Sequence, residues 1–223
     1  MQPIGEYYEA LAATYDESRF GHSYGRYVDA LERGVLGDWL GGHRPEAVVD
    51  LGCGTGRFLD FAATGVDGSA AMLEEAGKKH PGRQLVHADL ASTGLEPRAF
   101  DAAICFHVLM HLDEPTIASV VREAARLVRP AGRFVFDVPS KARRDLGRRQ
   151  PTGWHGDTSA SLADVGRWAG AEWRLARWRG IVFFPVHRVP SGLRGALRPL
   201  DAAIGRTPLG RWSSYVVCEL ERR

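Results

Sequence analysis

The sequence predicts one α/β domain built on a doubly wound sheet, and three observations carry this prediction. After residue 46, short apolar runs typical of buried parallel strands alternate with stretches of helical periodicity. The first run ends in a glycine-rich turn, which is where open α/β sheets bind ligands. The 223 residues, 44% hydrophobic and 25% charged, suit a single domain with a substantial core. Repeated strand and helix segments also imply right-handed crossovers.

The first forty residues predict helices that cover the sheet. Two sets of residues fall at helical spacing on one face, namely Tyr8, Leu11, Ala12 and Tyr15, then Tyr27, Leu31, Val35 and Leu36. We expect a single domain over 1–223, in which 1–42 form a helical cover, 43–140 a cofactor-binding core and 141–223 a substrate-side portion.

The core segment alternates between the two periodicities. The predicted strands are 47–51, 65–67, 84–88, 100–106 and 132–138. The predicted helices are 58–63, 69–79 and 114–128, with Ser69 as the N-cap of the second and Arg129-Pro130 closing the third.

The C-terminal portion is basic and carries an insertion before the last strand. We expect a polar loop at 141–157, a helix near 161–169, a strand near 173–184, a helical middle within 185–210 and a final strand at 214–220. Residues 1–140 have a net charge of −7 and residues 141–223 of +9. An arginine-rich surface and a bound anionic ligand both explain this asymmetry. The insertion is long enough to form a lid or a substrate wall.

Composition excludes several classes of protein. The net charge of +2 provides no overall field that would attract nucleic acid. Three distant cysteines, Cys53, Cys105 and Cys218, give neither a disulfide framework nor a zinc motif, so a reducing cytoplasm is the expected setting. The N-terminus lacks a signal-peptide pattern. No apolar run approaches the ~20 residues that a membrane span needs.

The turn after the first strand carries the most functional information. Its glycines Gly52, Gly54 and Gly56 follow a GxGxG pattern, whereas a dinucleotide fingerprint is GxGxxG. Arg57 occupies the place of the third fingerprint glycine. Asp50 precedes the first glycine, where a carboxylate repels a phosphate and attracts an ammonium group.

Five segments extend this pattern between Tyr7 and Pro139: VVDLGCGTGRF, GVDGSAAMLEEA, VHADL, FDAAICFHVLMHL and ARLVRPAGRFVFDVP. In this order they resemble the class I S-adenosylmethionine-dependent methyltransferases, in particular the small-molecule branch (methyltransferase type 11) that includes quinone-biosynthesis enzymes. The resemblance implies a Rossmann-like, seven-stranded, mostly parallel sheet with a reversed last strand. It also implies S-adenosylmethionine as the cofactor and S-adenosylhomocysteine as its product.

The resemblance assigns cofactor contacts to the ends of the strands. The three glycines would pass beneath the methionine moiety, and Asp50 would face its amino group. Asp67 would accept hydrogen bonds from both ribose hydroxyls, because a carboxylate takes two donors at once. Only ten residues separate Gly56 from Asp67, so the first crossover helix has to be short. Asp67 is also explained as a residue that merely ends a strand.

Further contacts are implied for the adenine and for the cover. Asp89 and Leu90 would read the adenine edge, while Met72 and Phe106 would cover its ring and the sulfonium side. Asp89 as a turn residue and Met72 as a core residue are the structural alternatives. The cover resembles the family's YD-containing helix at Tyr15-Asp16, so Tyr15, together with Tyr8, would close the pocket. Arg19 would pair with the methionine carboxylate.

Three histidines are the candidate catalytic residues. His107 and His111 follow the fourth strand and would share a face if that stretch is helical. His155 lies in the polar loop after the fifth strand. Each would act as a general base for a hydroxyl acceptor, and each is also explained as a structural histidine. HVLMH lacks the glutamate of HExxH, so we predict no metal site.

Two arginine groups suggest the charge of the acceptor. Lys141, Arg143, Arg144, Arg148 and Arg149 follow the fifth strand, and Arg188, Arg194 and Arg198 lie in the insertion. If both groups border one pocket, the acceptor would carry a phosphate or a carboxylate.

The predicted function is methyl transfer to an oxygen or nitrogen of a small molecule such as an anionic, sugar or secondary-metabolite acceptor, by a cytoplasmic monomer or homodimer. An RNA or protein methyltransferase and a noncatalytic S-adenosylmethionine-binding protein stay as alternatives. A nucleic-acid substrate is argued against because the fourth strand ends in CFHV rather than in an Asn/Asp-Pro-Pro-aromatic turn. The GxGxG spacing argues against a nicotinamide oxidoreductase.

Overall fold

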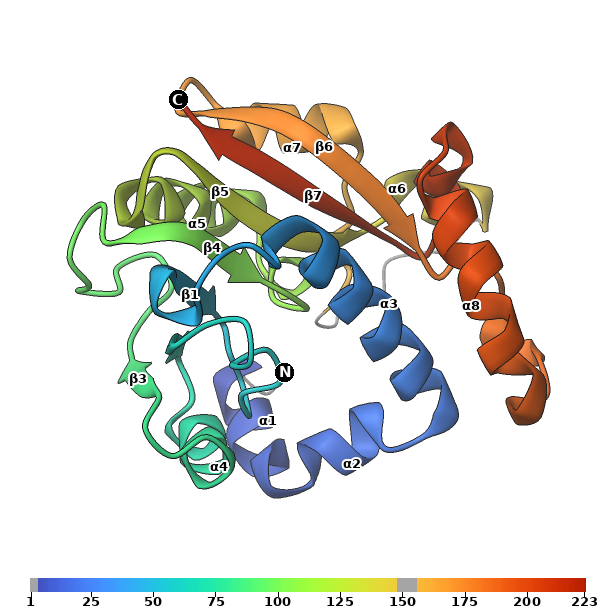
Figure 1. Ribbon diagram of the computed structural model, residues 1–223, viewed down its shortest axis with the longest axis horizontal. Helices are drawn as coiled ribbons and strands as arrows, with labels where there is room; N and C mark the ends of the chain where they lie inside the picture. The colour runs from blue at the N-terminus through green and yellow to red at the C-terminus, as the bar shows by residue number, and fades with distance from the viewer. Residues whose placement is uncertain (1–3, 148–155) are drawn as a thin grey trace.

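The predicted alternation of strands and helices is present in the computed structural model, which describes residues 4–147 and 156–223 (Figure 1). The first five strands are β1 (Val48–Leu51), β2 (Thr64–Asp67), β3 (Gln84–His87), β4 (Phe100–Cys105) and β5 (Val128–Pro139). β1 is buried along its whole length and β2 and β4 nearly so. Burial on both faces explains their apolar runs.

Two further strands, β6 (Trp173–Ile181) and β7 (Tyr215–Arg222), complete the sheet. Over the described ranges, seven strands pair in the order β3-β2-β1-β4-β5-β7-β6. β7 runs antiparallel to both of its neighbours, which confirms the reversed last strand. The order reverses between β1 and β4, so the crevice for a ligand lies at their carboxyl ends.

Helices pack on both faces of the sheet (Figure 1). In chain order they are α1 (Ile4–Leu11), α2 (Tyr15–Phe20), α3 (Ser23–Leu40), α4 (Ala70–Lys79), α5 (Glu114–Leu127), α6 (Lys141–Leu146), α7 (Leu162–Ala169) and α8 (Ser191–Gly205). The side chain of Ser69 accepts a hydrogen bond from the Met72 N–H, which confirms Ser69 as the N-cap of α4.

Local structure departs from the sequence prediction at four places. The start of the predicted loop at 141–157 forms helix α6 (Lys141–Leu146), because the Ser140 side chain accepts a hydrogen bond from the Arg143 N–H and caps it. The segment 58–63 forms turns rather than a helix, because the short connection between β1 and β2 first accommodates the glycine loop. The first predicted helix is split at Ala12–Thr14 by a 3₁₀ turn, where Thr14 leaves helical geometry with φ −117° and ψ 4°. Arg129 and Pro130 lie in β5 because the strand begins directly after α5 ends.

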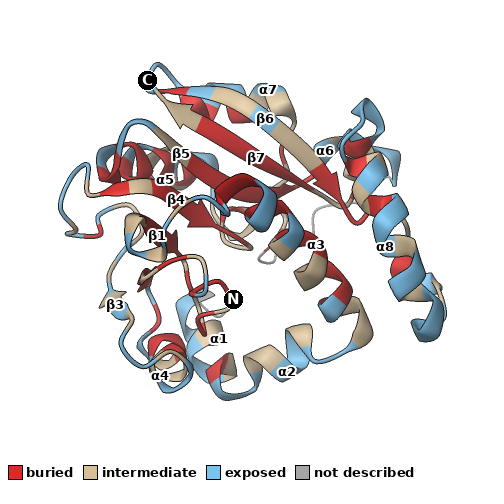
Figure 2. Ribbon diagram, in the orientation of Figure 1, coloured by how far each residue is buried: buried red, intermediate tan, exposed pale blue. Residues whose placement is uncertain are grey.

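The strands distribute their apolar side chains to two cores. Val49 and Leu51 of β1 face the core that includes α5 and α7, while Val48 faces the core beneath α3. Figure 2 shows the central strands buried and the outer helix faces exposed. Among the described helices, none combines the length and apolar content needed to cross a membrane.

Candidate active site

The glycine loop follows β1 where the strand order reverses. Gly52 and Gly54 have positive φ angles of 80° and 53°. A Cβ on Gly52 would lie 2.3 Å from Cγ2 of Val108, so a side chain is excluded there. A Cβ on Gly54 would meet no atom within 4 Å. The loop therefore offers bare main chain next to open space, which a closely approaching ligand requires.

The Asp67 carboxylate joins the glycine loop to the turn after β2. Its Oδ2 accepts a hydrogen bond from the Gly54 N–H at 2.8 Å, and its Oδ1 accepts one from the Ser69 N–H at 2.9 Å. Burial raises the pKa of Asp67 against the effect of these N–H groups. A carboxylate has about four acceptor positions. Acceptor positions beyond those used by the backbone would take ribose hydroxyls, and this role stays a prediction.

Asp50 lies in β1 and is only 2% exposed. Burial raises the pKa of its carboxyl to about 7, since the effect of the Arg57 cation is insufficient to offset it and Asp67 raises the pKa further. Within residues 4–147 and 156–223, no group donates a hydrogen bond to this carboxylate. A cationic ligand would stabilise this carboxyl, because a nearby ammonium group favours its ionised form.

Arg57 is a buried structural cation, a role that the glycine spacing does not reveal. Its guanidinium lies 4.1 Å from the ring centroid of Phe20 and 3.9 Å from that of Phe58. Its Nη1 pairs with Glu32 Oε2 at 2.6 Å and with Asp29 Oδ1 at 3.0 Å. Arg57 therefore fixes the end of the glycine loop to α3 and α2.

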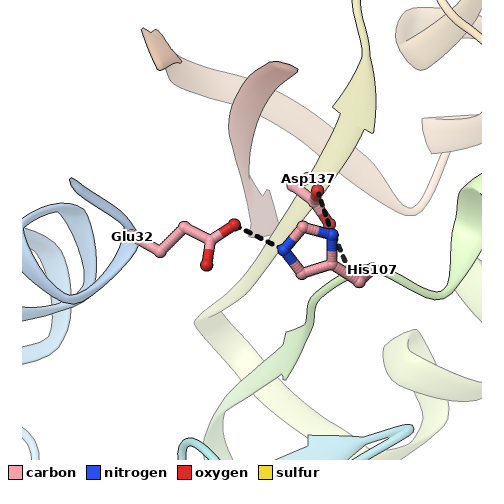
Figure 3. Close-up of side chains that lie close together, drawn as sticks. All are labelled: Glu32, His107 and Asp137. Carbon is pink, nitrogen blue, oxygen red and sulfur yellow. Dashed lines mark hydrogen bonds and ion pairs between the residues drawn. The ribbon is translucent and has the colours of Figure 1, made fainter. Parts of the chain in front are cut away.

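The side chain of His107 lies between two buried carboxylates (Figure 3). Its Nε2 is 2.7 Å from Glu32 Oε1, and its Nδ1 is 3.8 Å from Asp137 Oδ2. The His107 N–H also donates to Asp137 Oδ1 at 2.6 Å. Burial alone would lower the pKa of His107, but Glu32 and Asp137 raise it above its usual range. Both ring nitrogens of His107 therefore face acids, and these acids favour its protonated form.

Sequence reasoning missed Glu32 and Asp137, which together with His107 place potential metal ligands within 4.8 Å of one another. Burial would raise the pKa of Glu32, but Arg57 and His107 outweigh it and hold that pKa at about 2. Arg57 and His107 thus face Glu32 from two sides, while burial raises the pKa of Asp137. A structural network is the simpler explanation of this geometry.

A cavity of about 360 Å³ opens beside His107 at the carboxyl ends of β4 and β5. Its wall is aromatic and basic. The lining comprises Tyr8, Tyr15, Ser18, Arg19, Phe20, His22, Tyr24, Gly25, Val28, His107, Met110, His111, Arg144, Gly156 and Tyr215. No carboxylate occurs among these lining residues, which are drawn from the described part of the chain. The cavity therefore favours an acceptor with negative charge or an electron-rich ring.

His111 lines this cavity, and its Nε2 lies 2.9 Å from the hydroxyl oxygen of Tyr8. Burial raises the pKa of Tyr8, so its hydroxyl stays protonated. His107 and His111 do not share a helix face: His107 has φ 58°, and Leu109–His111 is a 3₁₀ turn. The third candidate, His155, lies outside the described residues.

The N-terminal cover is tied directly to the cofactor side. Thr55 Oγ1 donates to Asp16 Oδ1 at 2.6 Å, and the Glu9 carboxylate accepts hydrogen bonds from the first N–H groups of α4. Tyr15 and Arg19 line the cavity, and Arg19 Nη2 donates to the Tyr7 hydroxyl at 2.7 Å. The cover thus closes over the loop, while the contacts predicted for Tyr15 and Arg19 stay predictions.

The residues predicted for the adenine lie in different environments. Asp89 is exposed, and its Oδ1 accepts a hydrogen bond from the Ala91 N–H at 2.8 Å. Leu90 approaches the glycine loop, since its Cδ1 would lie 3.5 Å from a Cβ on Gly52. Met72 is buried, and Phe106 packs edge-on against Phe58 at 5.1 Å between centroids. Their contacts with the cofactor stay predictions.

The two predicted arginine groups do not border one pocket. Arg144 lines the cavity, whereas Arg143 donates to the carbonyl of Trp212 at 3.1 Å. Arg194 bonds to Ser23 and Val189, and Arg198 lines a separate groove between α3 and α8. Arg188 does not line the cavity either, and Arg148 and Arg149 lie outside the described residues. The prediction was wrong because the insertion packs against α3, away from the cavity.

Comparison with known proteins identifies similar sequences. Residues 49–136 match the family described as "Methyltransferase domain". The ubiquinone biosynthesis O-methyltransferase of Alkalilimnicola ehrlichii is 29% identical over 187 residues, 72% of this chain and 74% of that protein. The trans-aconitate 2-methyltransferase of Methylobacterium nodulans is 31% identical over 204 residues, 76% of this chain and 77% of that protein.

Comparison with solved structures identifies the same fold. A structure from Thermotoga maritima, described as an S-adenosylmethionine-dependent methyltransferase and possible histamine N-methyltransferase, matches with a TM-score of 0.72. The match covers 99% of this chain and 100% of that one, at 17% identity. At this identity the likeness concerns the fold alone.

Proposed function

The chain belongs to the class I S-adenosylmethionine-dependent methyltransferases, and we propose that it methylates an oxygen or nitrogen of a small anionic molecule. The domain is proposed to extend over 1–223, with 1–42 as the cover, 43–140 as the cofactor core and 141–223 on the substrate side.

The residues at the glycine loop fit S-adenosylmethionine. Gly54 presents open main chain, Asp50 is a buried carboxylate suited to an ammonium, and Asp67 keeps acceptor positions for ribose hydroxyls. When bound, the cofactor supplies an electrophilic methyl group on a sulfonium. The protein's contribution to the reaction is to orient the acceptor and to exclude water, which is worth ~7–11 kcal/mol when the geometry is good.

The observation that carries the proposed acceptor class is the composition of the 360 Å³ cavity. Arg19 and Arg144 contribute permanent positive charge to the lining. The aromatic rings of Tyr15, Phe20 and Tyr215, among others, supply an apolar wall. A carboxylate-bearing acceptor would find its charge complemented here, and a cationic one would be repelled.

A hydroxyl acceptor must lose a proton, and His111 with Tyr8 is the group placed to receive it. The 2.9 Å contact between His111 Nε2 and the Tyr8 hydroxyl would allow the hydroxyl to pass its proton to the ring as it takes up the acceptor's proton, so that Tyr8 itself stays protonated. His107 is a positioning residue, because its ring nitrogens are occupied by acids. The name of the Alkalilimnicola relative, an O-methyltransferase, supports an oxygen acceptor.

Steady-state kinetics on a panel of paired hydroxylated carboxylates and their neutral amides test the acceptor class. We expect Arg144→Gln to raise the KM for a carboxylate acceptor at least about tenfold while leaving S-adenosylhomocysteine affinity unchanged. Arg143→Gln is the matched control, since Arg143 lies on the same helix but outside the cavity lining. Preference for the neutral amides, or equal effects of both variants, would contradict the proposal.

A further inference from the structure

We infer that the hydroxyl groups of Tyr24 and Tyr215 bind the carboxylate of the acceptor, an inference that rests on the proposed function. Tyr24 is the second residue of α3 and Tyr215 is the first residue of β7, and both line the cavity of about 360 Å³ beside His107. The fold thus brings two phenols from distant parts of the chain to one cavity. We call them the tyrosine pair.

Neither hydroxyl of the tyrosine pair is used within the protein. In the ranges 4–147 and 156–223, no group forms a hydrogen bond with either one. The other two tyrosines of the cavity are placed differently, since the Tyr8 hydroxyl lies 2.9 Å from His111 Nε2 and Tyr15 packs against Tyr8 on the cover. Both members of the pair are only partly buried, and neither hydroxyl oxygen is enclosed by protein atoms. Two hydrogen-bond donors are therefore open to a ligand in this cavity.

Both phenols are carried by elements whose backbone is fixed. Tyr215 begins β7, which pairs with β5 and β6, and its ring packs edge-on against that of His107 at 5.5 Å between centroids. Tyr24 lies in the first turn of α3, which the His22 side chain caps by accepting a hydrogen bond from the Gly25 N–H at 2.9 Å. Because the backbone of both residues is already ordered, binding through them costs little conformational entropy.

The charges around the tyrosine pair suit a carboxylate. Burial raises the pKa of both phenols, so each stays protonated and can donate a hydrogen bond. Of the neighbouring groups, Tyr24 raises the pKa of Tyr215 most, which indicates that the two hydroxyls lie near each other, while Asp137 and Glu32 raise it less. Arg144 lowers this pKa, so a cation also lies within range. Two donors beside a cation match the two oxygens of a carboxylate.

The tyrosine pair adds direction to the charge that Arg144 supplies. The Arg144 guanidinium donates hydrogen bonds to the backbone carbonyls of Gly156 and Asp157, so its position is set by the protein and its donors are shared with these carbonyls. The two hydroxyls are not shared in this way. An amide of the same shape offers one acceptor oxygen and no charge, so the pair favours the acid over the amide.

Calorimetric titration of the full chain, with S-adenosylhomocysteine present, tests the tyrosine pair through binding alone. The probes are 4-hydroxybenzoate, whose ring carries both a hydroxyl and a carboxylate, and its neutral amide. We expect Tyr24→Phe and Tyr215→Phe each to weaken binding of the acid at least about tenfold, because a hydrogen bond to a charged group is lost. Binding of the amide should weaken by no more than about threefold, since a hydrogen bond between neutral groups contributes less.

Tyr27→Phe is the matched control. It removes a phenol hydroxyl from the same helix but outside the cavity lining, where this hydroxyl donates to Asp201 Oδ2 at 3.0 Å. The control should bind both probes like the unmodified chain, and circular dichroism should show every variant folded. Unchanged affinity for the acid in either tyrosine variant, equal losses for acid and amide, or no binding of 4-hydroxybenzoate at millimolar concentration would overturn the inference.

Arg144→Gln separates this inference from the proposed function. If Arg144→Gln weakens binding of the acid while Tyr24→Phe and Tyr215→Phe leave it unchanged, the anionic acceptor stands and the tyrosine pair does not bind it. If the unmodified chain binds the amide more tightly than the acid, both the proposed acceptor class and the inference are wrong.

Discussion

Replacing Asp50 with Asn should stabilise the fold at alkaline pH while weakening cofactor binding. Burial raises the pKa of Asp50 to about 7, against an ordinary value of 3.8. The difference of about three units corresponds to about 4 kcal/mol, at 1.36 kcal/mol per unit. This is the free energy by which the ionised carboxylate destabilises the folded state above pH 7.

The sign follows from proton uptake. Between pH 3.8 and about 7, the folded chain binds a proton on Asp50 that the unfolded chain releases, so stability falls as the pH rises through this window. Asn removes this loss but buries an amide, which costs about 1–3 kcal/mol. Asp50→Asn should therefore gain about 1–3 kcal/mol at pH 8, or about 2–12 °C in Tm. At pH 4 it should gain nothing.

Binding should change in the opposite direction. An ammonium group that faces Asp50 loses a buried charged partner in the variant, which costs at least about 2 kcal/mol, or about 30-fold in the Kd of S-adenosylhomocysteine. For the unmodified chain, affinity should rise as the pH passes 7, because the ligand requires the ionised carboxylate.

Thermal unfolding at pH 4 and pH 8, with calorimetric titration of S-adenosylhomocysteine, checks both effects. Asp60→Asn is the control, since Asp60 is exposed and should change neither quantity appreciably. If Asp50→Asn destabilises the fold equally at both pH values, the ionised Asp50 carboxylate does not destabilise the fold as we propose. An unchanged Kd would refute its role toward the ligand.

Three other substitutions give distinct outcomes. Glu32→Gln leaves Arg57 and His107 buried without their shared acid, so thermal unfolding should show a loss of about 3–5 kcal/mol; a loss below 1 kcal/mol would contradict the network. His111→Asn should lower kcat for a hydroxyl acceptor about 10²–10⁴-fold with little change in cofactor affinity; an unchanged kcat would remove His111 from proton transfer. Gly52→Ala places a Cβ 2.3 Å from Val108 at a φ of 80°. It should therefore lower the free energy of unfolding by about 1–3 kcal/mol in denaturant titrations and weaken cofactor binding. Unchanged stability and affinity would show that the loop adapts to the side chain.

The sheet was predictable because burial on both faces leaves a plain record in the sequence. β1 and β4 are largely apolar runs, each with a single aspartate, and Ser69 begins its helix with a side chain that accepts a hydrogen bond from the Met72 N–H. The segment 58–63 was not predictable from its composition. Its apolar residues Phe58, Leu59 and Ala62 are buried, but in turns that follow the glycine loop.

The buried network around His107 left a weaker signal. Glu32 lies on α3 in register with Val28, Val35 and Trp39, which are all buried. Asp137 likewise interrupts the apolar end of β5. An acid on an otherwise apolar face indicates a buried partner. Which partner it has depends on the packing of α3 against β4 and β5, and no local pattern encodes that contact.

The arginines show the opposite limit. The number of arginines after residue 140 is evident from the sequence, but the direction in which each side chain points is not. Arg143 and Arg144 are neighbours on α6, yet only Arg144 lines the cavity, because successive helical side chains point about 100° apart. Composition therefore indicated a basic C-terminal portion, but it did not show that the arginines of α8 lie outside the cavity lining.

The central claim is that the glycine loop with Asp50 and Asp67 binds the cofactor, and calorimetric titration of the purified chain with S-adenosylhomocysteine tests it most directly. We predict one site per chain, no heat with NAD, at least about 30-fold weaker binding in Asp67→Ala, and unchanged binding in Asp60→Ala. Binding of NAD, or equal affinity of Asp67→Ala and the unmodified chain, would contradict the claim.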